Sequence, residues 1–207
     1  ELAMSIFGQS YGTNISGQLY LNGKEVQLKT VKQAIKNKLA YVTEDRKGNG
    51  LVLTNPIKIN TTLANLDSIS PHKIIDKDKE YQVAEEYRGK LKTKCPTVEQ
   101  NVGNLSGGNQ QKVLLAKWMF ADPDVLILDE PTRGIDVGAK YEIYCIINDL
   151  VAAGKSVVMI SSELPEVLGM SDRIYIMNEG RIAGELSAEE ASQEKIMSII
   201  VNSGKGA

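Results

Sequence analysis

The sequence has 207 residues, of which 42% are hydrophobic and 24% are charged, and its formal net charge is −2. This size and composition are typical of one large globular domain, or of a core that carries a subdomain, and the charge offers no basic face for nucleic acid. No apolar run reaches the roughly 18 residues expected of a membrane span, and the two cysteines lack a metal-site spacing, so both are expected to be unpaired thiols, with Cys145 buried.

The first fifty residues predict alternating short helices and strands. Asn22-Gly23 is a dipeptide typical of a tight hairpin turn, and the apolar spacing before it and after it fits helices. The predicted elements are a helix over residues 1–7, two strands within 15–26, a helix over 30–38, a buried strand over 39–42 and a charged loop over 43–50. The chain opens inside a predicted helix and without a Met, so we expect a part of a longer protein.

Residues 53–103 are polar and mostly helical in pattern, and three prolines interrupt them. The charges of both signs over residues 76–94 predict a solvent-exposed helix face.

The remaining sequence alternates helices with short apolar strands. The predicted elements are a helix over 109–120, a strand over 125–128, a helix over 137–153, a strand over 156–160, a hairpin of 173–177 with 181–183, and a helix over 188–201. The continuous apolar runs over 125–128 and 156–160 predict strands buried on both faces. This alternation predicts an α/β fold with a parallel sheet covered by helices.

Two acids, Asp129 and Glu130, follow the strand over 125–128 directly. Ligands of an open parallel sheet gather beyond the carboxyl ends of its strands, so these carboxylates are expected to face a ligand crevice. Any strand can end in two acids, so this pair alone is weak evidence for a site.

Ser106, Gly107 and Gly108 stand at the start of the helix over 109–120, where a serine can act as N-cap and glycines let a ligand approach the backbone. A helix start of this kind favours a phosphate group. The simpler interpretation is a capped helix after a glycine turn, and Asp136 could likewise be only the N-cap of its helix. The apolar residues of the same helix are expected in the core: Val113, Leu114, Trp118 and Met119.

Four segments together resemble the second ATP-binding domain of the tandem ATPases that serve monosaccharide importers of the ABC family. They are VTEDRKGNGL (42–51), GNLSGGNQQK (103–112), LDEPTRGIDVGAKYEIY (128–144) and ISSELPEVLGMSDRIYIMNEGRI (160–182). The resemblance spans nearly the whole chain. It implies a P-loop-NTPase-like (RecA-like), mainly parallel sheet with an α-helical subdomain, without the N-terminal strand and phosphate loop. The implied division is 1–52 as partial core, 53–104 as helical subdomain and 105–207 as the rest of the core.

The resemblance also implies roles for individual residues, with ATP and Mg²⁺ as cofactors. Asp129 would hold Mg²⁺ through water, and Glu130 would polarise the attacking water as the catalytic residue. Asp136 would be the D-loop acid at the interface between two domains. The signature residues would grip ATP bound to the opposing domain: Ser106, Gly107, Gly108 and Gln110.

Three departures from an active domain predict a weak site on this chain itself. No phosphate loop of the form GxxxxGK[ST] occurs in the 207 residues. Glu44 stands at the Q-loop position, where it adds negative charge near phosphate. Ser162 stands at the switch position, where it cannot supply the positive charge of a histidine, and the only histidine, His72, is expected at the surface.

These features predict an asymmetric pair, in which this chain couples ATP hydrolysis to sugar import mainly by completing a partner's ATP site. The implied partners are the first ATP-binding domain on the same or another chain, a transmembrane sugar permease and, indirectly, a periplasmic or extracellular sugar-binding protein. The implied location is peripheral, on the cytoplasmic face of the bacterial plasma membrane. The alternative is an inactive interaction module that docks on the permease or partner domain. An ABC protein of repair or translation is disfavoured, because no long coiled-coil insertion or basic linker occurs.

Overall fold

The computed structural model of the protein describes residues 1–204. They form two compact units, divided between Ile160 and Ser161, and each unit is described by itself.

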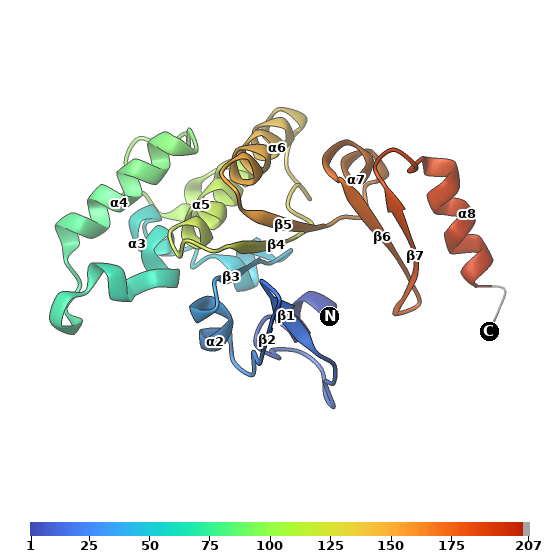
Figure 1. The fold of residues 1–207 in the computed structure, drawn as a ribbon. Helices are drawn as coiled ribbons and strands as arrows, with labels where there is room; N and C mark the ends of the chain where they lie inside the picture. Colours follow the sequence, from blue (N-terminus) through green and yellow to red (C-terminus); the bar gives the residue numbers. More distant parts are fainter. Residues whose placement is uncertain (205–207) are drawn as a thin grey trace. The chain divides into compact units, whose positions relative to one another are not determined.

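A three-stranded parallel sheet is the centre of the first unit (Figure 1). Its strands are β3 (Leu39–Val42), β4 (Val125–Asp129) and β5 (Ser156–Ile160), in the order β3-β4-β5. All four residues of β3 are buried, and so are the three central residues of β4. The predicted parallel α/β sheet is therefore confirmed for these strands.

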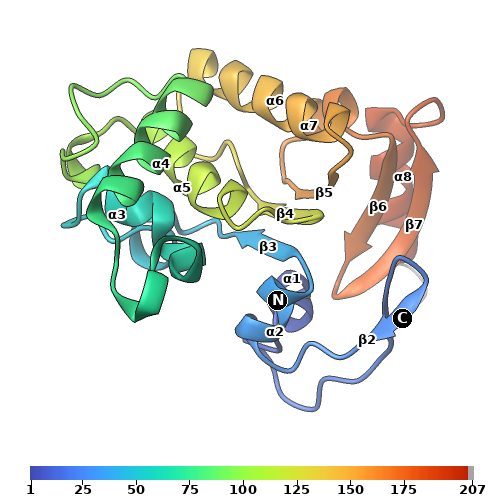
Figure 2. The same cartoon turned by 60° about the vertical axis from the view of Figure 1, so that its left-hand side comes forward.

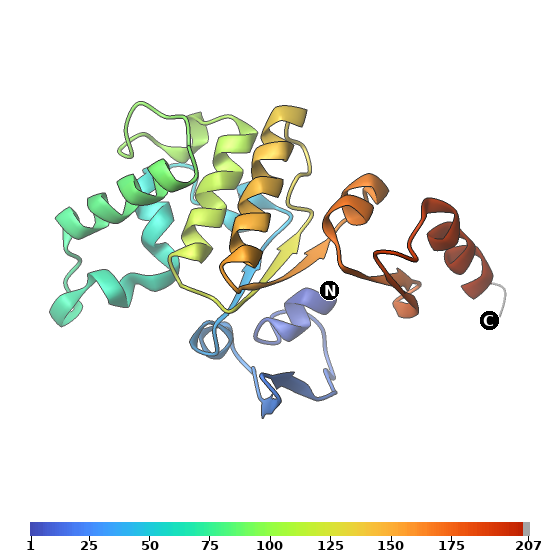
Figure 3. The same ribbon diagram turned by 45° about the horizontal axis from the view of Figure 1, so that its top comes forward.

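Helices cover both sides of this sheet. Figure 2 shows α5 (Gly107–Met119) and α6 (Val137–Ala152) on one side of the strands, with α1 (Leu2–Ile6) and α2 (Val31–Lys36) on the other. Figure 3 shows α5 and α6 lying side by side. Helix α6 ends before Gly154, whose φ of +84° is easy for glycine only.

The core under α5 is built as its apolar spacing predicts. Val113, Leu114, Trp118 and Met119 are all buried. The ring of Phe7, which follows α1, packs edge-on against the Trp118 ring at a centroid distance of 5.5 Å. This contact holds α1 against α5.

Strand β5 is less buried than the sequence predicts. Val158 is 50% exposed and Ile160 is 38% exposed, so the prediction that both faces are buried is wrong for this strand. Among the described residues β5 pairs with β4 alone, and its side chains alternate between exposed and half-buried. The apolar composition is thus that of a central strand, while the burial is that of an edge.

The predicted hairpin consists of β1 (Leu19–Leu21) and β2 (Lys24–Val26). Asn22 and Gly23 both have positive φ, +51° and +74°, as a two-residue turn between twisted strands requires.

Residues 53–103 are mostly helical, as predicted, and contain α3 (Ile57–Thr62), α4 (Lys77–Lys90) and three 3-10 turns (Leu63–Ile69, Pro71–Lys73 and Val102–Asn104). The segment predicted as a charged loop over 43–50 instead contains a π-helical turn (Arg46–Gly50). The predicted solvated face of α4 is wrong at Glu80, which is buried and accepts a hydrogen bond from Thr62 Oγ1 at 3.3 Å. Packing against α3 provides the partner that lets this acid be buried.

The second unit is a hairpin packed on helices. It contains α7 (Leu164–Met170), β6 (Arg173–Asn178), β7 (Arg181–Ser187) and α8 (Gln193–Ser203). Ile174, Ile176 and Ile196 form its buried core. Helix α8 begins five residues later than predicted, because Ser192 is the residue that caps it, accepting from Lys195 N–H at 3.2 Å.

Cys145 is exposed, so the prediction that it is buried is wrong. The buried face of α6 is formed by Ile143, Ile146 and Ile147, and Cys145 lies on the opposite face. Within residues 1–204, the structure contains no helix of the length and hydrophobicity that crossing a membrane requires.

Candidate functional site

The start of α5 packs against α6 at Gly108. A Cβ at Gly108 would come within 2.5 Å of the Ala139 Cβ, a distance that side chains do not adopt. Glycine at this position therefore allows the two helices to approach closely. As a result, the first turn of α5 and the first turn of α6 border the same space.

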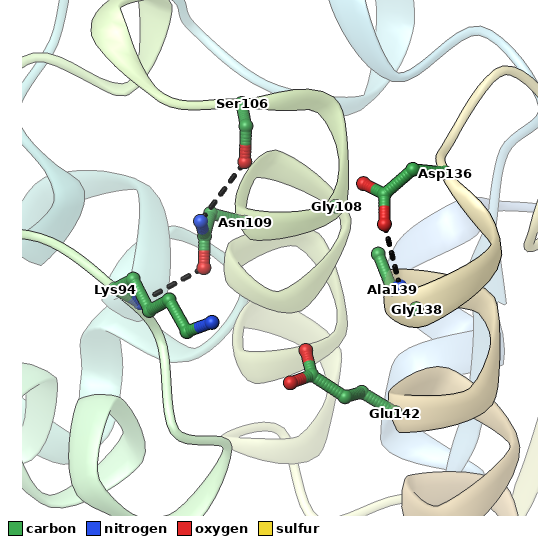
Figure 4. A pocket seen from close by; sticks show the side chains of 8 residues that line it. All are labelled: Lys94, Ser106, Gly108, Asn109, Asp136, Gly138, Ala139 and Glu142. Carbon is green, nitrogen blue, oxygen red and sulfur yellow. Dashed lines mark hydrogen bonds between the residues drawn. The ribbon is translucent and has the colours of Figure 1, made fainter.

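A pocket of about 240 Å³ opens at this junction (Figure 4). Its lining comes from α5, from α6 and from the loop before α5. The lining residues are Lys94, Ser106, Gly108, Asn109, Asp136, Gly138, Ala139 and Glu142. Of the predicted site residues, the structure thus brings Ser106, Gly108 and Asp136 together.

Ser106 occupies the N-cap position of α5, but its side chain is engaged differently from the predicted cap. Its Oγ accepts a hydrogen bond from Asn109 Nδ2 at 2.9 Å and does not cap a backbone N–H of the first turn. Asn109 Oδ1 in turn accepts from the backbone N–H of Lys94 at 2.8 Å. The first backbone N–H groups of a helix have no intrahelical acceptor, so this turn can donate to an anion.

The charged groups of the pocket are mostly paired. Asp136 Oδ1 accepts from the Ala139 N–H at 2.9 Å, so the predicted N-cap role is confirmed. The Glu142 carboxylate forms an ion pair of 2.8 Å with buried Lys112, and this hydrogen bond keeps the pKa of Glu142 below its usual value. Figure 4 shows the Lys94 and Glu142 side chains pointing toward one another. With both acids engaged, Lys94 is the exposed cation of the pocket.

The two acids lie where the sequence predicts them, at the carboxyl end of the strand, with Asp129 as the last residue of β4 and Glu130 directly after it. Asp129 Oδ2 accepts a hydrogen bond from the Tyr41 hydroxyl at 2.7 Å. Burial, and then this bond to Asp129, raise the pKa of Tyr41 well above its usual value. Glu130 has a φ of +46°, a conformation that is costly for a residue with a side chain and is often found at functional sites.

Glu44 forms an ion pair with Arg133, a residue of the loop after Glu130. The neighbouring Arg46 reaches the same loop, because its Nη1 donates to the Arg133 carbonyl oxygen at 3.0 Å. Glu44, the residue predicted at the Q-loop position, is therefore tied to the loop that leads to Asp136. This ion pair was not predicted, because a glutamate and an arginine so far apart in the chain give no local sign of their pairing.

The other predicted site residues lie outside this pocket's lining: Glu44, Gly107, Gln110, Asp129, Glu130 and Ser162. Gln110 is buried at 4% exposure, and its Nε2 donates to the Val102 carbonyl oxygen at 3.3 Å. Ser162 belongs to the second unit, where it is exposed and precedes α7. Lys94 and Asn109 were not predicted as site residues. Asn109 lies within the signature segment 103–112, so its place in the sequence could have indicated that it belongs to the site.

The helix-covered parallel sheet, the two acids at the end of its central strand and the glycine-containing helix start are the arrangement expected of an ATP-binding cassette. A family model described as ABC transporter matches residues 2–133. The chain therefore belongs to the ABC transporter family.

Curated relatives are ATP-binding proteins named for sugars. The chain is 61% identical to the L-arabinose transport ATP-binding protein AraG of Geobacillus stearothermophilus, over 97% of this chain and 39% of that protein. It is 56% identical to the xylose import ATP-binding protein XylG of Thermoanaerobacter pseudethanolicus, over 95% and 39%. It is 52% identical to the ribose import ATP-binding protein RbsA of Clostridium perfringens, over 97% and 40%. The chain thus spans about two fifths of the length of these relatives.

Solved structures agree on the fold. An ATP-binding cassette of an ABC transporter superposes with a TM-score of 0.77 at 20% identity, over 95% of this chain and 81% of that one. A nucleotide-free ATP-binding cassette gives a TM-score of 0.75 at 17% identity, over 99% and 79%. The predicted P-loop-NTPase-like α/β fold is confirmed.

Proposed function

We propose that this chain is an ATP-binding part of a bacterial monosaccharide importer, and that it acts mainly by completing the ATP site of a partner ATP-binding domain. The observation that carries this proposal is the pocket at the start of α5, where Ser106, Gly108 and Asp136 meet. Ser106 and the backbone N–H groups of Gly107 and Gly108 would donate hydrogen bonds to the terminal phosphate of ATP held by the partner. Gln110 would hold this helix start in place through Val102. The names of the relatives support a sugar as cargo.

The partner domain would belong to the same polypeptide or to another chain. In this proposal residues 53–104 form the helical subdomain that docks on a transmembrane sugar permease, between the core parts 1–52 and 105–207. A periplasmic or extracellular sugar-binding protein would deliver the sugar to that permease. The chain would then lie at the cytoplasmic face of the plasma membrane, held by its protein partners.

The residues of the chain's own hydrolytic site fit Mg²⁺ held through water. Asp129 Oδ2 accepts from the Tyr41 hydroxyl, and a carboxylate is the kind of oxygen ligand that Mg²⁺ prefers. Mg²⁺ is commonly bound through one or two carboxylates, waters and nucleotide phosphates, and there it neutralises phosphate charge. Glu130 would orient and polarise the water.

This own site is expected to be weak. Glu44 brings a carboxylate to the Q-loop position and is engaged by Arg133, and Ser162 cannot carry a positive charge. The same contacts favour the second candidate function, a docking module that hydrolyses nothing. Nucleotide titration of this chain by itself is expected to reveal neither tight binding nor turnover under either function.

Replacing Ser106 with Arg separates the two functions. In the assembled importer, with the partner ATP-binding domain present, Ser106→Arg is expected to lower ATP turnover by about 100-fold or more, because it fills the pocket and removes a donor. Ser198→Arg, on the exposed side of α8, is the matched control. Near-normal turnover with Ser106→Arg would contradict the proposal and leave the docking module.

A further inference from the structure

The orientation of the Asn109 amide is fixed by its neighbours. The backbone N–H of Lys94 donates to Asn109 Oδ1 at 2.8 Å, and a backbone N–H can only donate. The amide oxygen must therefore face Lys94, and the amide nitrogen must face Ser106. Figure 4 shows Asn109 between these two residues, with both hydrogen bonds drawn.

This orientation decides what the Ser106 hydroxyl can do. Asn109 Nδ2 donates to Ser106 Oγ at 2.9 Å, so the hydroxyl accepts on that side. A serine hydroxyl has one hydrogen to donate and two lone pairs that accept. Since the amide nitrogen cannot accept, the hydroxyl hydrogen must point elsewhere, and Ser106 lines the pocket.

The same amide holds the backbone at Lys94, whose side chain also lines the pocket. A second contact holds the same segment, because Lys112 Nζ of α5 donates to the Lys92 carbonyl oxygen at 3.0 Å. The Asn109 amide thus connects two groups suited to an anion, a hydroxyl donor and an ammonium group.

We propose that Asn109 is a positioning residue that directs the Ser106 hydroxyl as a donor into the pocket and sets Lys94 beside it. The group they serve is the terminal phosphate of a nucleotide. This inference rests on the proposed function and deepens it, because it assigns a role to a residue that does not itself need to touch the nucleotide.

The sharpest test is Asn109→Asp, which changes one amide nitrogen to oxygen at almost constant shape. One carboxylate oxygen can still accept from the Lys94 N–H, so the loop contact is kept. The other oxygen can only accept, so it draws the Ser106 hydroxyl hydrogen toward itself and away from the pocket. Asn104→Asp is the matched control, since it adds the same charge at an exposed position two residues before Ser106.

In the assembled importer, Asn109→Asp is expected to lower kcat/KM for ATP by about 10- to 100-fold, the effect of losing a hydrogen bond to a charged group. Asn104→Asp is expected to change it by less than about 3-fold, as exposed charges are screened. In a Ser106→Ala background, Asn109→Asp should cause no more loss than Asn104→Asp. Unfolding followed by Trp118 fluorescence should stay close to wild type, which separates positioning from misfolding.

Equal effects of Asn109→Asp and Asn104→Asp would overturn the inference. So would an undiminished effect of Asn109→Asp in the Ser106→Ala background, because Asn109 would then act without Ser106. If Ser106→Arg impairs turnover while Asn109→Asp does not, only the role of Asn109 fails. If Ser106→Arg has no effect, the proposed function itself fails.

Discussion

Replacing Lys112 is the strongest test of which contacts hold the walls of the pocket together. Its side chain is only 2% exposed, and its ammonium group forms an ion pair with Glu142 of α6 at 2.8 Å. The same group donates to the Lys92 carbonyl oxygen at 3.0 Å. One buried lysine on α5 therefore fastens α6 and the loop that carries Lys94.

Two replacements separate its charge from its packing. Lys112→Met keeps most of the buried stem and removes the hydrogen bonds of a charged donor, which contribute about 1.5–3 kcal/mol. The same change removes the desolvation cost of burying the ammonium group, which offsets part of this loss. We therefore expect a net decrease of about 1–2 kcal/mol in the free energy of unfolding. Lys112→Ala also removes buried stem carbons at about 0.8 kcal/mol each and leaves a cavity, so we expect about 3–5 kcal/mol.

The assay is urea unfolding followed by the fluorescence of Trp118, the only tryptophan in the sequence, which is 9% exposed in the first unit. Lys32→Met, at an exposed position of α2, is the control and is expected to stay within about 0.5 kcal/mol. Equal costs for Lys112→Met and Lys112→Ala would refute the separation into charge and packing. A cost below about 0.5 kcal/mol for both, the range of ordinary surface substitutions, would refute the supporting role altogether.

Three further outcomes follow from the same structure. Burial lowers the pKa of Lys117 to about 8 from its usual 10.5, so between these pH values the unfolded chain binds more protons than the folded chain. The free energy of unfolding of wild type relative to Lys117→Met should therefore rise with pH, by at most about 1.4 kcal/mol per pH unit. A difference that does not change with pH would contradict this. Glu44→Gln should change thermal stability by less than about 0.5 kcal/mol, because both partners of its ion pair with Arg133 are well exposed, at 45% and 65%. Glu130→Gln should reduce turnover of the assembled importer far less than the equivalent change in the partner domain, and complete loss would contradict the asymmetry.

Local sequence predicted the parts of the fold that local physics decides. The Asn22-Gly23 dipeptide predicted a hairpin turn, and both residues have the positive φ that such a turn requires. The apolar residues 39–42 predicted a buried strand, and all four are buried. The family signature likewise predicted that Ser106, Gly108 and Asp136 belong to one site, and the structure brings them to one pocket.

What the sequence could not predict depends on partners distant in the chain. Glu44 and Arg133 are 89 positions apart, and neither residue reveals the other in sequence. The predictions of burial were wrong at some positions for a related reason. Val158 is apolar yet 50% exposed because exposure depends on which strands and helices lie beside it, and Glu80 is charged yet buried because α3 supplies a hydroxyl.

The start of α5 combines a structural cost with the property that its proposed role requires. A serine at the N-cap usually stabilises a helix by about 1 kcal/mol by accepting from a first-turn N–H. Here the Ser106 oxygen accepts from Asn109 instead, so the helix does not gain that stabilisation. The N–H groups that a cap would occupy stay available at the pocket, beside the hydroxyl of Ser106. An anion that accepts from these groups would return the missing stabilisation to the helix, so binding at this pocket and stability of α5 should be linked.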